Sequence, residues 1–244
     1  IKDESSDFYT TMFKRPEYVR DNRVFYPYIQ DAVHGTEVTL NTHSDDFNSA
    51  LGHEGGYRQV YYKTASMLYN LQYVLGDELF LKAMKHYFEQ WKVCHPYFED
   101  FRNSIIQFTN IDLNWFFDQW LETSKTIDYE VECVKRTKDT SVVKSTSDKL
   151  FHYTITLKRV GSMQMPLDLM VLGKDGKTYN YYIPNTWFVK KTNAAILPKW
   201  IGWGKLNDVY KASVSLPTKI RDVIIDPSER LADIYTPDNS KKYR

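Results

Sequence analysis

The sequence predicts an α+β protein in which a helical part precedes a β-rich part. In the first half, apolar residues recur every three or four positions, which is the spacing of amphipathic helices. From about residue 128 onward, apolar and polar residues alternate, which is the spacing of half-buried strands. We therefore predict a helical subdomain over residues 1–126 and an antiparallel β-sandwich over residues 127–244.

The central helices are predicted from their apolar stripes and their end signals. One helix is predicted from Gly56, with its apolar stripe from Val60 onward, and it stops at Gly76, because glycine readily ends a helix. The next begins at Asp77, as its cap, and continues through Trp91 with a regular apolar face. We interpret these stripes as core packing, since amphipathic helices normally bury their apolar face.

Two further helices are predicted after Pro96, and one is predicted near the N-terminus. Residues 98–108 carry a third apolar stripe, and a fourth helix opens at Asp112, whose carboxylate can accept a backbone N–H at the helix start. Residues 17–31 are also predicted to be helical. The polar segment 34–55, rich in Gly, Asp, Ser and Asn, indicates a loop.

The second half predicts about seven short strands, a number taken from their spacing along the chain. The sequence Lys174-Asp175-Gly176 follows a buried strand and is typical of a hairpin turn. The strand segments that we identify are residues 129–136, 151–160, 167–173, 177–183, 212–216 and 222–227.

Composition narrows the class of protein. The 244 residues are 42% hydrophobic and 16% aromatic, which is typical of a globular chain. The balance of 32 basic and 31 acidic residues argues against nucleic-acid or polybasic membrane binding. No segment approaches the roughly 20 apolar residues of a membrane span. Cys94 and Cys133 are too few for a disulfide scaffold, and we expect two unpaired, partly buried thiols.

A search for catalytic motifs finds no complete set. The one His-Glu pair, His53-Glu54, would need a second histidine at position 57, where Tyr57 stands. A reversed motif at His86 fails because Gln90 replaces the second histidine. Neither place is expected to hold a metal, since a lone imidazole is usually structural or solvated. The acid pairs Asp45-Asp46 and Glu99-Asp100 are typical of loops and caps.

Several elements in order resemble the M1 family of zinc metallopeptidases, gluzincins that act mostly as aminopeptidases. They are Tyr61-Tyr62-Lys63-Thr64 at a helix start, Leu75-Gly76 at its end, the helix to Trp91, the segment at 98–105, and the segment at 112–121. The resemblance covers most of residues 57–239, and the ending at 223–239 is similar to Bacteroidetes-type members. It implies a fold like the C-terminal half of a thermolysin-like catalytic domain followed by a β-sandwich.

The resemblance also implies roles for particular residues. In M1 enzymes zinc polarises the scissile carbonyl, an acidic residue activates the metal-bound water, and the tyrosine of Tyr-x-Lys donates a hydrogen bond to the oxyanion. Carried over, that tyrosine is Tyr61, while Tyr62 and Lys63 position the helix and Tyr57 lines the substrate cleft. Thr64 departs from the family, where many members carry Gly or Ala.

The family's HExxH motif and its third ligand, a glutamate, are not found before Tyr61. One explanation is a fragment of a longer aminopeptidase, which the missing initial Met favours. Its parent would use zinc, act on peptides, contain the N-terminal remainder of the catalytic domain, and lie in the periplasm or cell envelope. The other is a non-catalytic relative. Either way, we expect this chain alone to bind no catalytic zinc and to be inactive.

A third hypothesis ignores the family and assigns ligand binding to the β-sandwich. Three tryptophans in predicted loops, Trp187, Trp200 and Trp203, could act as exposed platforms for a carbohydrate or a protein. At this density, aromatic residues more often fill the core and edges of a sandwich. The solvent exposure of the three rings distinguishes the two interpretations.

Overall fold

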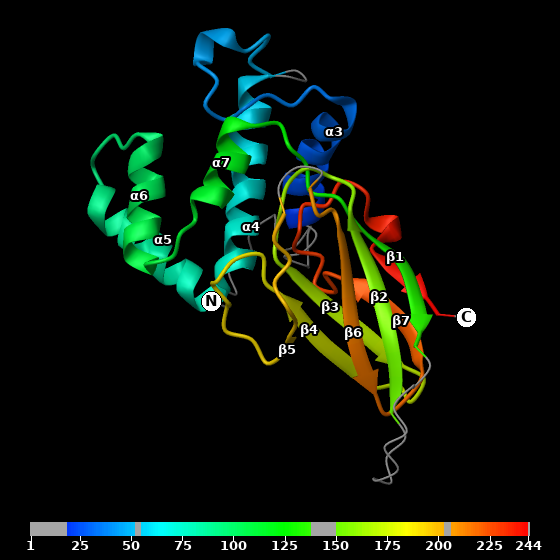
Figure 1. Ribbon diagram of the computed structural model, residues 1–244. Helices are drawn as coiled ribbons and strands as arrows, with labels where there is room; N and C mark the ends of the chain where they lie inside the picture. The colour runs from blue at the N-terminus through cyan, green and yellow to red at the C-terminus, as the bar shows by residue number, and fades with distance from the viewer. Residues whose placement is uncertain (1–18, 52–54, 138–149, 203–205, 244) are drawn as a thin grey trace, which may run out of the picture. The chain divides into compact units, whose positions relative to one another are not determined.

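The computed structural model describes residues 19–51, 55–137, 150–202 and 206–243 (Figure 1). It confirms the α+β class, with the helices preceding a β-rich part. By compactness the chain divides into two units. Unit 1 comprises residues 1–71 and 113–124, and unit 2 comprises residues 72–112 and 125–244. The predicted domains, 1–126 and 127–244, follow secondary structure instead and stay a prediction.

Unit 1 is built from helices around an aromatic core. The ring of Tyr28 lies 5.6 Å from that of Trp120, and the ring of Phe25 lies 5.8 Å from that of Tyr69. Both Tyr28 and Trp120 are almost fully buried. The elements of this unit are the π-helix η1 (Arg20–Phe25), α3 (Tyr26–His34), the 3₁₀ turn η2 (Ser44–Asp46), the π-helix η3 (Arg58–Lys63), α4 (Thr64–Leu75) as far as Leu71, and α7 (Asn114–Glu122).

The helix predicted over residues 17–31 ends later than expected. It continues to His34, and Gly35 follows with φ of 68°, the left-handed conformation that glycine adopts without strain. The predicted start of the fourth helix is also wrong, because Leu113 and not Asp112 occupies the N-cap position of α7.

Unit 2 contains the last turn of α4 from Gln72 and two helices, α5 (Asp77–Trp91) and α6 (Phe98–Thr109), which pack against each other. The bounds of α5 match the prediction, but Asp77 is not its cap. Gly76 holds the N-cap position, and the Asp77 carboxylate accepts hydrogen bonds from Gln72 and Arg230 at 3.0 and 2.6 Å.

The β-rich part of unit 2 contains two sheets, with strand orders β1-β2-β6 and β5-β4-β3-β7-β8. β1 of the first sheet contacts β7 and β8 of the second. Among the strands of the described residues, every pairing is antiparallel except that of β4 with β5, so the prediction of an antiparallel sandwich is wrong at this edge. The strands are β1 (Tyr129–Arg136), β2 (Phe151–Arg159), β3 (Leu167–Gly173), β4 (Thr178–Ile183), β5 (Ala195–Ile196), β6 (Val209–Leu216), β7 (Ile220–Ile225) and β8 (Ser240–Lys242).

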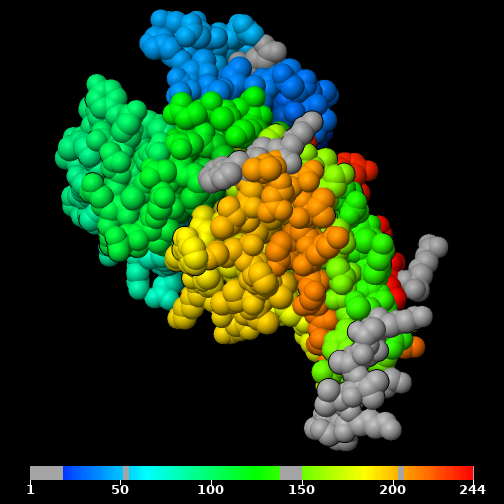
Figure 2. All heavy atoms as spheres, in the orientation of Figure 1, coloured from blue at the N-terminus to red at the C-terminus, as the bar shows by residue number. Residues whose placement is uncertain are grey.

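Alternation of burial along the strands explains why the period-two pattern predicted them. Along β3 every second residue from Leu167 to Gly173 is buried. Along β6 the alternate side chains are exposed, and Figure 2 shows them in orange on the surface beside β2. The predicted turn at Lys174-Asp175-Gly176 joins β3 to β4, and Gly176 has φ of 81°, a conformation that a β-branched residue would adopt only with strain.

Tyr73 and Lys190 connect the end of α4 to β3 within unit 2. The buried Tyr73 hydroxyl accepts the backbone N–H of Asp168 at 2.7 Å. The Lys190 ammonium lies 3.9 Å from the centre of the Tyr73 ring and donates to the Asp168 carboxylate at 2.7 Å. Burial, with the nearby charges of Asp168 and Asp226, raises the pKa of Tyr73 well above its ordinary value, so the phenol stays neutral.

Replacing Tyr73 with phenylalanine is expected to lower the free energy of unfolding by about 1 kcal/mol, because the Asp168 N–H loses its acceptor in a partly buried place. Urea unfolding measures the change. Tyr235→Phe, at a residue 56% exposed, is the matched control and should change stability by less than about 0.5 kcal/mol. Equal effects in the two variants would contradict the role given to the Tyr73 hydroxyl.

Candidate functional site

The first feature of the candidate site is a cluster of three tyrosines on η3 and the residue before it. The ring of Tyr57 lies 4.6 Å from that of Tyr61, tilted by 32°. It also meets the ring of Tyr62 edge-on, at 5.6 Å and 87°. Tyr57 and Tyr61 are 44% and 59% exposed, so the cluster presents two phenols to solvent. Tyr61 and Tyr57, the residues predicted from the M1 resemblance, thus lie together.

The π-helical turn explains this grouping. A π-helix bonds residue i to residue i+5, so side chains four and five positions apart lie on the same side of a wider turn. Tyr61 and Tyr62 are four and five residues after Tyr57, and they form the outer side. On the inner side, Gln59 and Lys63 are each 1% exposed. The helix predicted from Gly56 onward is confirmed, and the structure shows in addition that its segment Arg58–Lys63 is π-helical.

The inner side of η3 is held by a buried cation. The Lys63 ammonium pairs with the Glu37 carboxylate, and it donates to the carbonyl oxygens of Val38 at 2.9 Å and Thr123 at 3.2 Å. The two charged side chains are only 1% and 2% exposed. Lys63 therefore ties η3 to the segment after α3 and to the segment after α7, all within unit 1. This contact network supports the positioning role predicted for Lys63.

Burial acts on both members of this pair. It lowers the pKa of Lys63 and raises the pKa of Glu37, because removal from water disfavours each charged form, while the mutual attraction of the pair opposes both effects. Burial and the charge of Glu37 also raise the pKa of Tyr28 well above its ordinary value. Removal of either partner would therefore leave the other as an unpaired buried charge.

A second ion pair anchors the start of η3. The Arg58 guanidinium donates from Nε to the Asp31 carboxylate at 2.7 Å and from Nη2 to the Pro27 carbonyl oxygen at 2.8 Å. The Asp31 side chain is 2% exposed. Charge-assisted bonds of this kind are short and directional, so they fix the orientation of the turn against α3. Two ion pairs, Arg58–Asp31 and Lys63–Glu37, thus hold the turn that carries the exposed phenols.

Glu37 and Asp31 are the site residues that sequence reasoning missed. Glu37 falls in a polar segment that the sequence identifies only as a loop, and no spacing rule connects it to Lys63. A lysine next to three tyrosines is the one available signal, because a cation inside an otherwise aromatic helix start needs a counter-charge. That signal does not say which of the chain's acidic residues supplies it.

Two histidines of the sequence, His53 and His86, stand in incomplete metal-binding motifs. His53 and Glu54 lie outside the described residues. The ring of His86 stacks on that of Phe108 at 4.8 Å, which is a packing role. In the described ranges, no three His, Cys, Asp or Glu side chains converge to hold a metal ion. The described part of the chain thus contains no group of ligands for the zinc that the M1 resemblance implies.

The remaining predicted features are the cysteines and tryptophans. Cys94 and Cys133 are unpaired as expected, although Cys94 is exposed and not partly buried. Trp200 is 4% exposed and donates to the Asn207 carbonyl oxygen at 2.8 Å, so it is a core residue and not a platform. Trp187 is 87% exposed, but the Lys199 ammonium lies over its ring. Trp203 lies outside the described residues.

Comparison with known proteins identifies the class to which the helical segment is similar. Residues 35–120 match the model described as the Peptidase family M1 domain. This range includes Glu37, η3 with Tyr61, α4, α5 and α6, and most of α7. The match confirms the predicted resemblance to M1 metallopeptidases, whereas the Bacteroidetes type stays a prediction. No curated protein matches the chain.

The fold has a counterpart among solved structures. One match is the crystal structure of Legionella pneumophila aminopeptidase A in complex with aspartic acid, with a TM-score of 0.50 and 16% sequence identity. The alignment covers 87% of this chain and 22% of that chain. At this identity the similarity is one of fold. The chain described here thus corresponds to less than a quarter of the length of that aminopeptidase.

Proposed function

We propose that this chain is part of an M1-like aminopeptidase, in which the Tyr61 hydroxyl stabilises the oxyanion formed when a peptide bond is attacked. The observation that carries the proposal is an exposed phenol on a turn with two ion-pair anchors, inside the segment that matches the M1 model. A hydrogen-bond donor accelerates such a reaction only if it is held where the charge develops. Lys63 and Arg58 provide that rigidity in unit 1.

The neighbouring groups have supporting roles in this proposal. Tyr57 packs against the Tyr61 ring and limits its rotation, and its own exposed edge lies beside the peptide. Zinc, which supplies the Lewis acid in M1 enzymes, would be held by the N-terminal remainder of the parent's catalytic domain, because the family carries its HExxH motif before the Tyr-x-Lys element. That remainder and the peptide are the proposed partners, and the periplasm or cell envelope is the proposed location.

Membrane insertion is not part of the proposal. Among the described residues, no helix combines the length and the apolar character needed to cross a bilayer. For the ligand-binding alternative in the β-rich part, Trp200 is buried and is no platform, whereas Trp187 is 87% exposed with the Lys199 ammonium over its ring. The non-catalytic relative is retained as one outcome of the test that follows.

In the full-length parent, Tyr61→Phe is expected to lower kcat for amino-acid amides about 100-fold or more, the usual loss of one oxyanion donor. The measurement is turnover of fluorogenic amino-acid amides with and without a chelator. Tyr235→Phe, which removes an exposed phenol outside the tyrosine cluster, is the matched control and should leave kcat unchanged.

Two other outcomes have clear meanings. Equal turnover of wild type and Tyr61→Phe would remove Tyr61 from the mechanism and leave the family resemblance intact. No turnover by well-folded parent protein on a broad panel of amides would favour the non-catalytic relative. In that case the tyrosine cluster is a packed, half-exposed rim and nothing more.

A further inference from the structure

Acidic side chains gather in unit 2 where the start of β1 meets the chain that follows β7. Asp128 directly precedes β1, and Glu130 lies within it. Asp233 follows β7, and Asp238 ends the 3₁₀ turn η4 (Thr236–Asp238), which contacts β1. Two segments that are far apart in the sequence thus bring four carboxyl groups together, and we call this group the acidic cluster.

The charges of the acidic cluster do not balance. Burial raises the pKa of Asp128, and the charges of its three acidic neighbours raise it further, while Lys158 opposes them. The three other carboxyl groups therefore lie within electrostatic range of Asp128. Lys158 itself lies 3.2 Å from the Glu130 carboxylate. Four carboxylates set against this one ammonium leave a net charge of −3 when all of these groups are ionised.

Three side-chain oxygens at the cluster are buried and have no hydrogen-bond partner among the described residues. They are Oδ1 of Asp128, Oδ1 of Asp238 and Oδ1 of Asn239. Asp128 and Asn239 are each only 9% exposed. Because the Asn239 side chain bonds to the Asp233 carboxyl, and only its NH₂ group can donate there, the amide lies against the cluster with its oxygen left over.

Unpaired buried oxygens of this kind point to a missing partner, since buried polar atoms in folded proteins almost always have one. An amide oxygen and ionised carboxylate oxygens accept hydrogen bonds and cannot donate them. Another acceptor, such as an anion, would therefore be repelled by all three. The partner that fits both the oxygens and the net negative charge is a cation.

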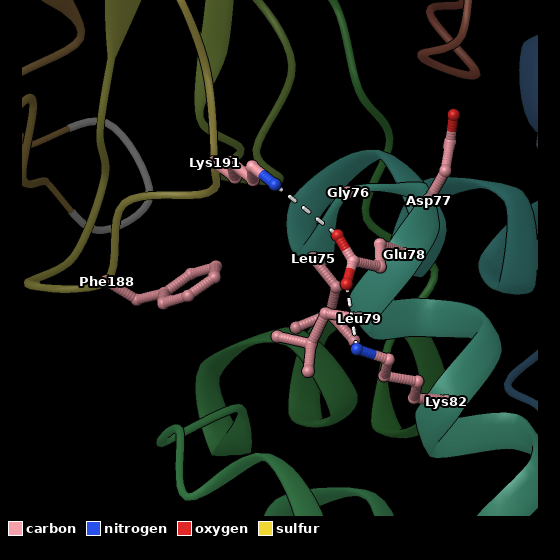
Figure 3. Close-up of a pocket in the computed structure, with 8 residues that line it drawn as sticks. All are labelled: Leu75, Gly76, Asp77, Glu78, Leu79, Lys82, Phe188 and Lys191. Atoms are coloured by element: carbon pink, nitrogen blue, oxygen red, sulfur yellow. Dashed lines mark hydrogen bonds and ion pairs between the residues drawn. The ribbon is translucent and has the colours of Figure 1, made fainter.

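The pocket at the first turn of α5 shows the opposite situation (Figure 3). There the Glu78 carboxylate lies between two lysines, 2.7 Å from Lys82 and 3.6 Å from Lys191. Asp77, which also lines this pocket, pairs with Arg230 at 2.6 Å. The charges of that pocket are thus satisfied within the chain, whereas the buried oxygens of the acidic cluster are not.

We propose that the acidic cluster binds one Ca²⁺ ion through the Oδ1 atoms of Asp128, Asp238 and Asn239. Ca²⁺ accepts carboxylate, amide and water oxygens in a flexible geometry, whereas Mg²⁺ demands a nearly ideal octahedron and gives up its water reluctantly. Two carboxylates with one amide are not a set of three His, Cys, Asp or Glu ligands, of which the described residues contain none. Water molecules would complete the shell of the ion.

Asp233 has a different role in this proposal. Its two oxygens already accept the backbone N–H groups of Tyr129 at 3.1 Å and Tyr235 at 2.9 Å. It also holds the NH₂ group of Asn239, which turns the amide oxygen away from it. Asp233 is therefore a positioning residue and not a ligand.

The test measures binding of CaCl₂ to the 244-residue chain by calorimetric titration, after dialysis against EDTA and then against chelator-free buffer with 150 mM NaCl. We expect one Ca²⁺ per chain with a Kd of about 10⁻⁴–10⁻³ M, the range of sites in extracellular modules. Mg²⁺ should bind at least about tenfold more weakly. In 10 mM CaCl₂ the Tm should rise by about 3–8 °C over its value in EDTA.

Substitutions assign the binding to these residues. Asp128→Asn and Asp238→Asn each keep an oxygen but remove a charge, and each should weaken Ca²⁺ binding about tenfold or more. Asn239→Ala removes the amide oxygen and should weaken it as well. Glu132→Gln, which removes an exposed carboxylate from β1, is the matched control and should leave the Kd unchanged. Circular dichroism in EDTA checks that each variant is folded, and Asp128→Asn should be, because it removes a buried charge.

The proposal is overturned if the folded chain shows neither saturable heat nor a higher Tm with Ca²⁺, because water or protons then fill the place of the ion. It is also overturned if Mg²⁺ binds as tightly as Ca²⁺, or if Asp128→Asn and Asp238→Asn bind as tightly as Glu132→Gln. Either result would reduce the effect to general attraction by surface acids. None of these readouts needs turnover, so the outcome is independent of the proposed peptidase activity.

Discussion

Replacing Lys63 with methionine is expected to lower the free energy of unfolding of unit 1 by about 3–5 kcal/mol, because it leaves the buried Glu37 without its partner. Methionine keeps the apolar length of the side chain, so the loss reports on charge and not on volume. The carbonyl oxygens of Val38 and Thr123 lose a donor as well. Hydrogen exchange of peptides that cover residues 58–70, followed by mass spectrometry, measures the change in this unit.

The loss in Lys63→Met should depend on pH in a defined direction. Burial already raises the pKa of Glu37, and removal of Lys63 takes away the attraction that lowered it. A carboxyl whose pKa in the folded state lies above that in the unfolded state stabilises the fold at low pH and loses that contribution as pH rises. The variant should therefore be closer to wild type near pH 5 than near pH 8.

A second substitution separates the charge effect from other causes. Adding Glu37→Gln to Lys63→Met removes the unpaired buried charge, and most of the lost stability should return. Lys82→Met, which breaks an exposed pair with Glu78, is the matched control and should cost about 0.5 kcal/mol or less. If the double variant is as unstable as Lys63→Met, the hydrogen bonds to Val38 and Thr123 carry the effect instead of the ion pair.

The same variant tests how the tyrosine cluster is formed. Without Lys63, the buried pair with Glu37 no longer holds the inner side of η3, and the turn can tighten from π to α geometry. In an α-helix, residues five apart lie about 140° apart around the axis, so the edge contact of Tyr57 with Tyr62 would be lost. Ring-to-ring contacts measured by NMR in Lys63→Met should thus retain Tyr57 with Tyr61 and lose Tyr57 with Tyr62.

Local periodicity explains which parts of the fold could be predicted. The α5 helix was predicted with its observed bounds, because its apolar face repeats regularly and Gly76 separates it from α4. The strands β1 and β3 were predicted for the same reason, with the period of two in place of the helical period. Each of these signals lies within the element that it predicts, so no distant contact is needed to interpret it.

Elements that depend on distant contacts could not be predicted. β5 has two residues and β8 has three, which is too short to show a period, and both form by pairing with a neighbour in the sheet. A π-helical turn keeps nearly the same apolar spacing as an α-helical one, so η3 was interpreted as α-helix. The Glu37–Lys63 pair joins a loop to a helix start 26 positions later, and charge in a loop normally indicates solvent.

Replacing Asp128 with asparagine is expected to stabilise unit 2 at neutral and higher pH. Asp128 is 9% exposed, and its Oδ1 atom is buried with no hydrogen-bond partner among the described residues. Burial, followed by the charges of Asp233, Asp238 and Glu130, raises its pKa to about 7, and Lys158 opposes this. Because asparagine is neutral at every pH, the variant avoids the ionised form that the folded state disfavours.

The sign of the pH dependence follows from the raised pKa. The wild-type fold gains stability from a protonated Asp128 below the ordinary pKa of 3.8 and loses it as pH rises toward and above about 7. The full effect corresponds to about 4 kcal/mol, and screening by nearby solvent reduces it, so we expect about 2 kcal/mol. Urea unfolding at several pH values between 4 and 8 should show a decline in wild type and a flatter curve in Asp128→Asn. Glu132→Gln, which removes an exposed carboxylate from the same strand, should decline as wild type does.

Asp233 is the informative comparison for Asp128, because both carboxyl groups are buried but only Asp233 accepts backbone hydrogen bonds, which favour its ionised form. Its oxygens accept the backbone N–H groups of Tyr129 at 3.1 Å and Tyr235 at 2.9 Å, which oppose the effect of burial and leave its pKa at about 6. Asp233→Asn places an NH₂ group where one of these donors must bind, so it should destabilise the fold at every pH. If Asp128→Asn raises the free energy of unfolding and Asp233→Asn lowers it, the backbone donors around each carboxyl decide which of the two holds the proton. Stabilisation by both would show instead that repulsion between the two carboxylates outweighs the hydrogen bonds.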